Sequence, residues 1–198
     1  MERAIVLASN NRGKLTELGQ ILAPFRLTVY PLANYTDESA DETGATFAEN
    51  AVLKARFAAR WSRLPAIADD SGLEVDALHG APGVYSARYA GVGASDAANN
   101  QKLLSALDGM PAQQRSARFR CVLAYVDDEN SEPILADGAW EGRILDAPRG
   151  SGGFGYDPLF LPAGSRLSAG EMSADEKNRS SHRAQALHVL AARLFVKA

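Results

Sequence analysis

The chain has 198 residues, a length that fits one globular domain or two tightly joined lobes. Hydrophobic residues make up 46% and charged residues 23%, a composition that excludes a disordered or low-complexity chain. The net charge of −3 gives no sequence-wide reason to bind a nucleic-acid polymer or an anionic membrane. Any recognition of phosphate must therefore come from a local basic site.

Localisation is indicated by the apolar runs and by the cysteine content. No apolar run approaches the roughly 20 residues of a membrane-spanning helix, and the N-terminus has no signal-peptide core. The single cysteine, Cys121, cannot form an internal disulfide, and its apolar surroundings favour burial over reactivity. We expect a cytoplasmic protein.

Periodicity predicts an α/β protein, because β-branched runs alternate with segments of helical spacing. The strands expected in chain order are 4–8, 26–30, 65–68, 118–126, 134–141, 143–145 and 159–161. The expected helices are 14–22, 46–62, 95–107 and a C-terminal stretch through Leu194, with Trp61 in the core. Capping boxes are predicted at Thr46 and Ser173, and the strands between 118 and 145 are expected to form an antiparallel meander.

The first candidate site is the loop that follows the first strand and opens the first helix. Its residues are Ser9, Asn10, Asn11, Arg12, Gly13 and Lys14. Free backbone N–H groups, the positive end of the helix and a lysine together favour an anion such as phosphate. It is not a P-loop, because Ala8 and Leu15 replace the required Gly and Ser or Thr, and an ordinary N-cap loop is the alternative.

The second candidate is the pair of adjacent carboxylates in Asp69-Asp70-Ser71-Gly72, which the pattern places at a polar turn ending the strand 65–68. Neighbouring strand side chains point to opposite faces, so one carboxylate is expected to reach a cleft while the other serves the scaffold. The sequence does not say which. Since aspartate is a weak base, its expected work is to hold a divalent cation and to orient water.

The third candidate is the glycine-rich segment 152–158, in which two aromatic rings and a carboxylate accompany a flexible backbone. That composition suits a flat ring that approaches and stacks, although a tight turn with core aromatics is the alternative. Lys177, His182 and Arg183 lie around the start of the last helix, where their donors could reach phosphates or the carbonyl edge of a base. A solvated helix start is the alternative for each of them.

Taken together, these segments resemble the non-canonical purine nucleoside triphosphate pyrophosphatase family, also called inosine triphosphate pyrophosphatases. The matching blocks, in the family's order over essentially the whole chain, are Ser9-x-Asn11-x-x-Lys14, Glu42-Thr43-Gly44-x-Thr46-Phe47-x-Glu49-Asn50-Ala51, Lys54-Ala55, Ala68-Asp69-Asp70-Ser71-Gly72-Leu73, Gly83-x-Tyr85-Ser86-Ala87-Arg88, Gly152-Gly153-Phe154-Gly155-Tyr156-Asp157-Pro158 and Ser181-His182-Arg183. Ser9 is a mild departure, since many relatives carry Thr, and either hydroxyl can donate to a phosphate.

The resemblance implies hydrolysis of ITP, dITP and XTP to the monophosphate and pyrophosphate with Mg²⁺, which removes deaminated purines from the nucleotide pool. It also implies a homodimer and an elongated mixed sheet with flanking helices, arranged as two lobes around a central cleft within one domain, 1–198.

The resemblance also assigns roles to individual residues. Ser9, Asn11 and Lys14 correspond to the triphosphate cradle, together with Asn10, Arg12 and Gly13 of the same loop. Lys54 and Lys177 add positive charge around the phosphates. Asp70 is similar to the family's proton acceptor and magnesium ligand, Glu42 to a second acidic group near the metal, and Ser71 to a substrate contact.

For the base, Phe154 resembles the stacking residue of the segment Phe154-Gly155-Tyr156-Asp157. His182 and Arg183 resemble donors near the 6-oxo edge of the purine. Adenine carries a donor at C6, and a pocket whose buried donors are left unpaired can discriminate by roughly 10⁴-fold. Guanine also carries a 6-oxo group, so rejection of GTP would depend on its 2-amino group.

Three alternatives stay open at the level of sequence. A pyrophosphatase for modified pyrimidine triphosphates is disfavoured by the purine-type stacking and His-Arg segments. A silent nucleotide sensor would not need Asp70 and Glu42. A P-loop kinase or ATPase is weakened by Ala8 and Leu15, and it would release orthophosphate.

Overall fold

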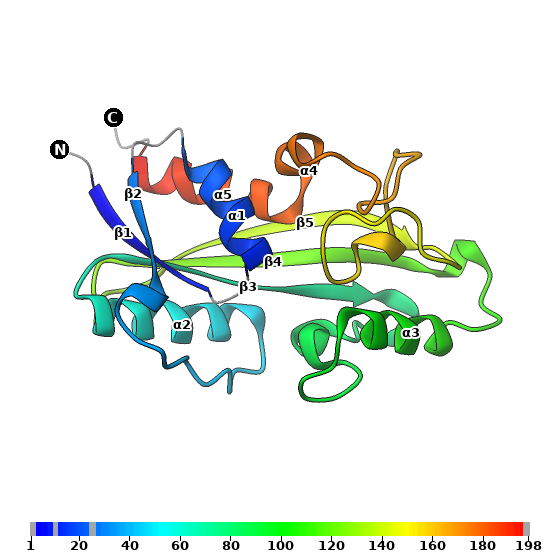
Figure 1. Cartoon of the computed structure of the whole chain (residues 1–198), viewed down its shortest axis with the longest axis horizontal. Helices are drawn as coiled ribbons and strands as arrows, with labels where there is room; N and C mark the ends of the chain where they lie inside the picture. The colour runs from blue at the N-terminus through cyan, green and yellow to red at the C-terminus, as the bar shows by residue number, and fades with distance from the viewer. Residues whose placement is uncertain (1–2, 10–11, 24–26, 196–198) are drawn as a thin grey trace. The chain divides into compact units, whose positions relative to one another are not determined.

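The computed structural model describes residues 3–9, 12–23 and 27–195, and within them the chain forms a six-stranded sheet of order β2-β1-β3-β4-β5-β6 (Figure 1). The strands are β1 Arg3–Ala8, β2 Leu27–Pro31, β3 Ala66–Val75, β4 Ser116–Val126, β5 Ile134–Ile144 and β6 Phe160–Pro162. β1 pairs in parallel with β2 and β3, whereas β5 and β6 are antiparallel. The predicted mixed α/β sheet is confirmed.

Helices flank the strands, and their starts follow the sequence signals. They are α1 Arg12–Leu22, α2 Phe47–Ser62, α3 Asp96–Ala106, α4 Ala174–Ser180 and α5 His182–Phe195. Both predicted capping boxes are present, at Thr46 and at Ser173. The C-terminal helical stretch is two helices, because Ser181 between them has an extended backbone. None of the helices in the described ranges is long and apolar enough to cross a membrane.

The chain divides into two compact units, of which the first contains residues 1–70, 121–138 and 182–198. Within this unit, α1 and α5 lie on one side of the strands and α2 on the other (Figure 1). The core under α1 and α5 contains Ile5, Leu7, Leu18, Leu22, Ile67, Cys121, Leu123, Tyr125, Ala136, Ala186, Leu187 and Leu190. Cys121 is buried as expected, and burial raises the pKa of its thiol, so it packs as an apolar group.

The prediction that Trp61 belongs to the core is wrong. Small residues of α2, such as Ala51, Ala55 and Ala58, are fully buried, so the helix packs closely by its alanine face. Trp61 lies on another face, is 43% exposed and packs its ring against Phe57 with the centroids 6.2 Å apart. Helical spacing places an aromatic residue on a face, and the tertiary packing decides whether that face is covered.

The second unit contains residues 71–120 and 139–181. Its core combines α3 with parts of β3, β4, β5 and β6, in residues Leu73, Val75, Leu103, Leu107, Ala117, Phe119, Trp140, Ile144, Tyr156, Leu159, Phe160 and Ala169. Phe160 lies at the centre of an aromatic group, with ring centroids 4.6 Å from Phe119 and 5.4 Å from Trp140. The expected packing role of Trp140 is confirmed, while the central cleft between two lobes stays a prediction.

Two strand boundaries differ from the prediction. The expected turn at 69–72 is part of β3, which continues to Val75, because the carboxylates are neutralised by cations and the apolar pattern resumes at Leu73. The segments 134–141 and 143–145 fall in one strand, β5, which ends at Ile144, since Gly142 continues the strand and pairs with Pro162 of β6. Turn propensity was overridden in both places by tertiary contacts.

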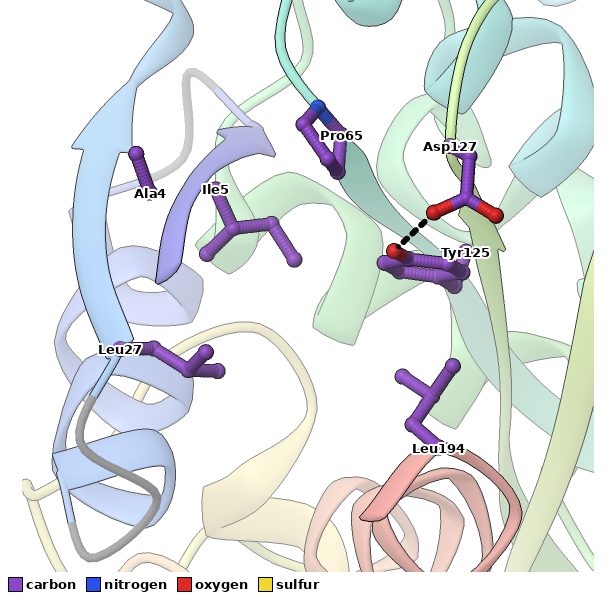
Figure 2. A pocket seen from close by; sticks show the side chains of 7 residues that line it. All are labelled: Ala4, Ile5, Leu27, Pro65, Tyr125, Asp127 and Leu194. Carbon is purple, nitrogen blue, oxygen red and sulfur yellow. Dashed lines mark hydrogen bonds between the residues drawn. The ribbon is translucent and has the colours of Figure 1, made fainter. Parts of the chain in front are cut away.

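A small cavity of about 60 Å³ lies in the first unit, at the end where β1 begins, and Figure 2 shows the side chains that line it. It is lined by Ala4, Ile5, Leu27, Pro65, Tyr125, Asp127 and Leu194. The one polar contact drawn there is the Tyr125 hydroxyl donating to Asp127 over 2.6 Å. A cavity of this size and lining is too small for a nucleotide. The candidate Ser9 follows the other end of β1, and Asp69 and Asp70 lie within β3.

Candidate active site

Ser9, which follows β1, lies beside the acidic segment of β3. β1 and β3 are parallel, with Ala8 paired to Ala68, so Ser9 comes directly after the end of β1 and Asp69 is the next residue within β3. Gly13 and Lys14 belong to the first turn of α1, which carries no acidic residue, so the predicted anion site keeps its positive helix end. The predicted ligands Asn10 and Asn11, and the side chain of Arg12, lie outside the described residues.

Asp69 is the carboxylate that faces α1 and α5. It is only 1% exposed, and its Oδ2 lies 2.9 Å from Lys14 Nζ and 3.6 Å from Arg183 Nε. Burial by itself would raise the pKa of this carboxyl, but Lys14, Arg183 and Lys54 hold it well below its usual range. Asp69 is therefore a permanent anion that holds two cations in place.

Asp70 points to the opposite face of β3, toward α2. Lys54 Nζ donates to its Oδ1 over 2.7 Å, and Asn50 Nδ2 donates to its Oδ2 over 3.3 Å. Burial raises the pKa of Asp70 above its ordinary value, although Lys54 opposes the shift. A carboxylate with a raised pKa accepts a proton more readily, which is the property expected of a general base.

Lys54 joins Asp70 to the second predicted acidic residue. Its Nζ also lies 3.2 Å from Glu42 Oε1, so two carboxylates converge on one ammonium group. Burial would lower the pKa of Lys54, but Asp69, Asp70 and Glu42 outweigh it and raise the pKa. The lysine is therefore charged, and it holds the carboxylate oxygens of Glu42 and Asp70 close together.

Asn50 positions Asp70, a role that the sequence did not reveal. It is fully buried on the alanine face of α2, and its Oδ1 accepts the N–H of Gly44 over 2.8 Å. A Cβ at Gly44 would lie only 2.7 Å from that oxygen, so glycine is needed for the approach. A polar residue among small apolar ones on a buried helix face is the signal that could have identified it.

In the second unit, Asp157 organises the aromatic loop. Its Oδ2 accepts the backbone N–H of Phe154 over 2.8 Å and lies 2.6 Å from Lys177 Nζ, and both charged side chains are buried. Lys177 Nζ also lies 4.8 Å from the centroid of the Phe154 ring, a cation–π distance. Gly153 has a φ of +74°, and a Cβ there would overlap the Asp157 carboxylate.

Tyr156 anchors the same loop from its other side. Its hydroxyl donates to the carbonyl oxygen of Ser86 over 2.8 Å, and burial raises its pKa, so the phenol keeps its proton. Ser86 in turn accepts the N–H of Leu73 on β3 over 2.9 Å. These contacts place Phe154 on a loop with several fixed points.

His182 and Arg183 begin α5, and both are buried, which excludes the solvated helix start. Gly138 of β5 allows this helix start to approach, because a Cβ at Gly138 would overlap the carbonyl oxygen of His182. Arg183 thereby reaches Asp69. Lys177 is buried too, so neither of the two later basic segments is a surface charge.

The structure brings the predicted residues together in two groups. The first unit holds Ser9, Gly13, Lys14, Glu42, Lys54, Asp70, His182 and Arg183. The second unit holds Ser71, Phe154, Gly155, Tyr156, Asp157 and Lys177. The first group is mostly charged, and its residue types suit contact with phosphates and water, whereas the second includes two aromatic rings, which suit a flat ring.

A buried carboxylate beside lysines, next to the carboxyl end of the parallel strand β1, is an arrangement suited to an enzyme that acts on phosphate groups. The chain belongs to the Ham1 family, whose model matches residues 5–193. The resemblance seen in the sequence is thereby confirmed.

Individual relatives are similar over nearly their full length. The chain is 57% identical over 195 residues to a dITP/XTP pyrophosphatase of Methylococcus capsulatus, covering 98% of this chain and 97% of that protein. It is 50% identical over 187 residues to the dITP/XTP pyrophosphatase of Escherichia coli K12, covering 94% and 95%. The solved structure of a HAM1 protein from Coxiella burnetii has a TM-score of 0.89 at 47% identity, with 97% of this chain and 98% of that chain covered.

Proposed function

We propose that this protein hydrolyses the non-canonical purine nucleoside triphosphates ITP, dITP and XTP to the monophosphate and pyrophosphate, and so clears deaminated purines from the cytoplasmic nucleotide pool. The observation that carries the proposal is the Asp70 group, a carboxylate of raised pKa held by Lys54 and Asn50. It occurs in a chain that is 57% identical to a protein named dITP/XTP pyrophosphatase.

Asp70 and Glu42 fit a magnesium ion. Both offer carboxylate oxygens, the donors that Mg²⁺ prefers, and both converge on Lys54. Mg²⁺ is commonly held by one or two carboxylates together with substrate phosphates, so two protein ligands suffice. When bound, the ion would offset the negative charge that develops on the leaving pyrophosphate.

In the proposed reaction, Asp70 orients a water molecule and accepts its proton as the water attacks the α-phosphorus. Pyrophosphate then leaves from the opposite side, whereas attack at the γ-phosphorus would release orthophosphate. Lys14 and the N–H groups at the start of α1 bind phosphate oxygens, and Ser9 donates from its hydroxyl. Lys54 stabilises the ionised form of Asp70 and adds positive charge to the same face.

The selectivity for the base is assigned to three residues. Phe154 stacks on the purine, and His182 and Arg183 donate to its 6-oxo edge. Since both side chains are buried, adenine would present its own C6 donor to their donors, and the cost of this buried mismatch is the physical reason to expect rejection of ATP.

The test is to incubate the purified protein with ITP, XTP, GTP and ATP, with and without Mg²⁺. Nucleoside monophosphate, pyrophosphate and orthophosphate are then quantified separately. We expect metal-dependent IMP and pyrophosphate from ITP, with little cleavage of ATP. Orthophosphate as the product would favour a phosphatase, and ITP binding without turnover would favour a sensor.

We also propose that the protein is a homodimer. The support is the exposed apolar face of α2, where Leu53 is 40% exposed and Trp61 is 43% exposed. A groove of about 530 Å³ lies beside Leu53. Light scattering coupled to gel filtration should give twice the chain mass of 21.1 kDa, and a Trp61→Glu variant should shift toward the monomer.

A further inference from the structure

Both backbone groups of Gly155 are held by one helix of the second unit. The N–H of Gly155 donates to Asp96 Oδ2 over 2.7 Å, and its carbonyl oxygen accepts from Asn100 Nδ2 over 2.9 Å. Asp96 and Asn100 are four residues apart in α3, so they lie one above the other on the same helix face. None of the motifs that point to the active site includes either residue.

These two hydrogen bonds act on Gly155, the residue that directly follows Phe154. Gly155 has a φ of +60°, and a Cβ there would meet nothing within 4 Å. Glycine is therefore required for its left-handed backbone and not for space. Such a backbone is intrinsically mobile, so its conformation must be held by outside contacts, and α3 supplies them on both sides of the residue.

The neighbouring anchors complete the support. The N–H of Phe154 is held by Asp157, and the hydroxyl of Tyr156 by the carbonyl oxygen of Ser86. The chain is thus held at Phe154 itself and at the two residues that follow it. An aromatic ring held in place before the ligand arrives binds more tightly, because less conformational entropy is lost on binding.

We propose that Asp96 and Asn100 are positioning residues that hold the Phe154 ring ready for the purine base. The inference rests on the proposed function, in which Phe154 stacks on the base. Asp96 and Asn100 act through Gly155 and touch no reacting atom, so their loss should raise KM and leave kcat nearly unchanged.

Each of the two hydrogen bonds can be tested by a substitution that changes a single hydrogen-bonding group. Donation to a carbonyl oxygen fixes which end of the Asn100 amide faces Gly155, and Asn100 Oδ1 is buried without a hydrogen-bond partner among the described residues. Asn100→Asp, which has nearly the same shape, would place a carboxylate oxygen against the Gly155 carbonyl oxygen. Asp96→Ala removes the acceptor of the Gly155 N–H, whereas Asp96→Asn keeps an oxygen there.

The control is Ser95→Ala. Ser95 caps α3 by accepting the N–H of Ala98 over 3.2 Å, and it has no hydrogen bond to Gly155. The substitution weakens the same end of the helix without releasing the loop. Any effect of general loosening of α3 therefore appears in this variant too.

The experiment measures kcat and KM for ITP. Asp96→Ala and Asn100→Asp should raise KM about three- to tenfold, the range that one lost hydrogen bond allows, with kcat within about twofold. Asp96→Asn should restore most of the wild-type KM, and Ser95→Ala should leave it unchanged. Inhibition by pyrophosphate, which has no base, should be the same in all variants. In a Phe154→Ala background, Asp96→Ala should no longer raise KM, because the ring it positions is gone.

Three results would overturn the proposal: a fall in kcat at unchanged KM, an equal KM effect in Ser95→Ala, or a KM effect that persists without Phe154. Hydrogen exchange of the ligand-free protein gives a readout that does not depend on activity. Amides of residues 153–157 should exchange faster in Asp96→Ala than in Ser95→Ala. If the wild type does not cleave ITP, the proposed function fails, but the exchange data still decide whether α3 orders the loop. Equal exchange in Asp96→Ala and Ser95→Ala rejects the inference by itself.

Discussion

Asp69 and Asp70 are neighbours in β3 and have the same side chain, yet they face opposite environments. Asp69 lies under α1 and α5 between Lys14 and Arg183, and its pKa is held far below the ordinary value. Asp70 lies toward α2 with Lys54, and burial raises its pKa. The lowered pKa of Asp69 disfavours proton acceptance, and the raised pKa of Asp70 favours it. Role is decided by the face of the strand and by the charges on that face.

Asp69 and Asp70 meet different environments because of the geometry of an extended chain. Successive side chains of β3 alternate between faces, so Ile67 and Asp69 share the side covered by α1 and α5. Asp70 falls on the side of α2, which supplies Asn50 and Lys54 one turn apart. The partners of Asp69 therefore come from α1 and α5, and the partners of Asp70 come from α2.

The largest expected effect is on turnover, from Asp70→Asn. The amide has the same shape but cannot accept the proton of water, so kcat for ITP should fall about 10³-fold, within the range of a lost general base. The melting temperature should stay near that of the wild type. Unchanged kcat would remove Asp70 from this role.

Asp69→Asn should lower the stability more than Asp70→Asn does, and it should lower kcat for ITP less. It leaves Lys14 and Arg183 without their buried carboxylate, a loss of about 3 kcal/mol in the free energy of unfolding. Urea denaturation of the two variants side by side measures the contrast. Equal destabilisation by both substitutions would contradict the division of roles.

Arg183→Ala should distinguish the role of Arg183 in recognising the base from its structural role as a partner of Asp69. Asp69 keeps Lys14 as its partner, so the variant should lose less stability than Asp69→Asn. Removal of a donor to the 6-oxo edge should narrow the ITP-to-ATP ratio of kcat/KM by about tenfold. A constant ratio would show that Arg183 does not recognise the base.

The smallest effect is expected from Asn50→Ala, which removes one hydrogen bond to Asp70. We expect kcat to fall about fivefold, the size of one lost neutral hydrogen bond to a positioned carboxylate. Ser62→Ala is the matched control, because Ser62 is also a buried polar residue of α2 and bonds only within 58–64. Similar kcat in the two variants would mean that Asn50 only supports packing.

Several features of the fold were predictable because they are local. The capping boxes at Thr46 and Ser173 depend on residues three apart, and the parallel start of the sheet follows from strand, helix and strand in succession. The grouping of Asp70 with Glu42 followed from the resemblance to the family, which assigned Lys54 to the phosphates. The extent of β3 was not predictable, because cations that are distant in sequence stabilise its acidic segment.

The sequence by itself determined the α/β class, the family and the segments that carry the chemistry, since residue type and spacing along the chain specify these. The tertiary structure alone decided that Asp69 and Asp70 face different cations, that Asn50 donates to Asp70, and that α3 holds Gly155. The physical reason is that each of these depends on a charge or a hydrogen-bond partner from another element. The pKa of a side chain and its hydrogen bonds depend on neighbouring groups, and only folding brings those groups together.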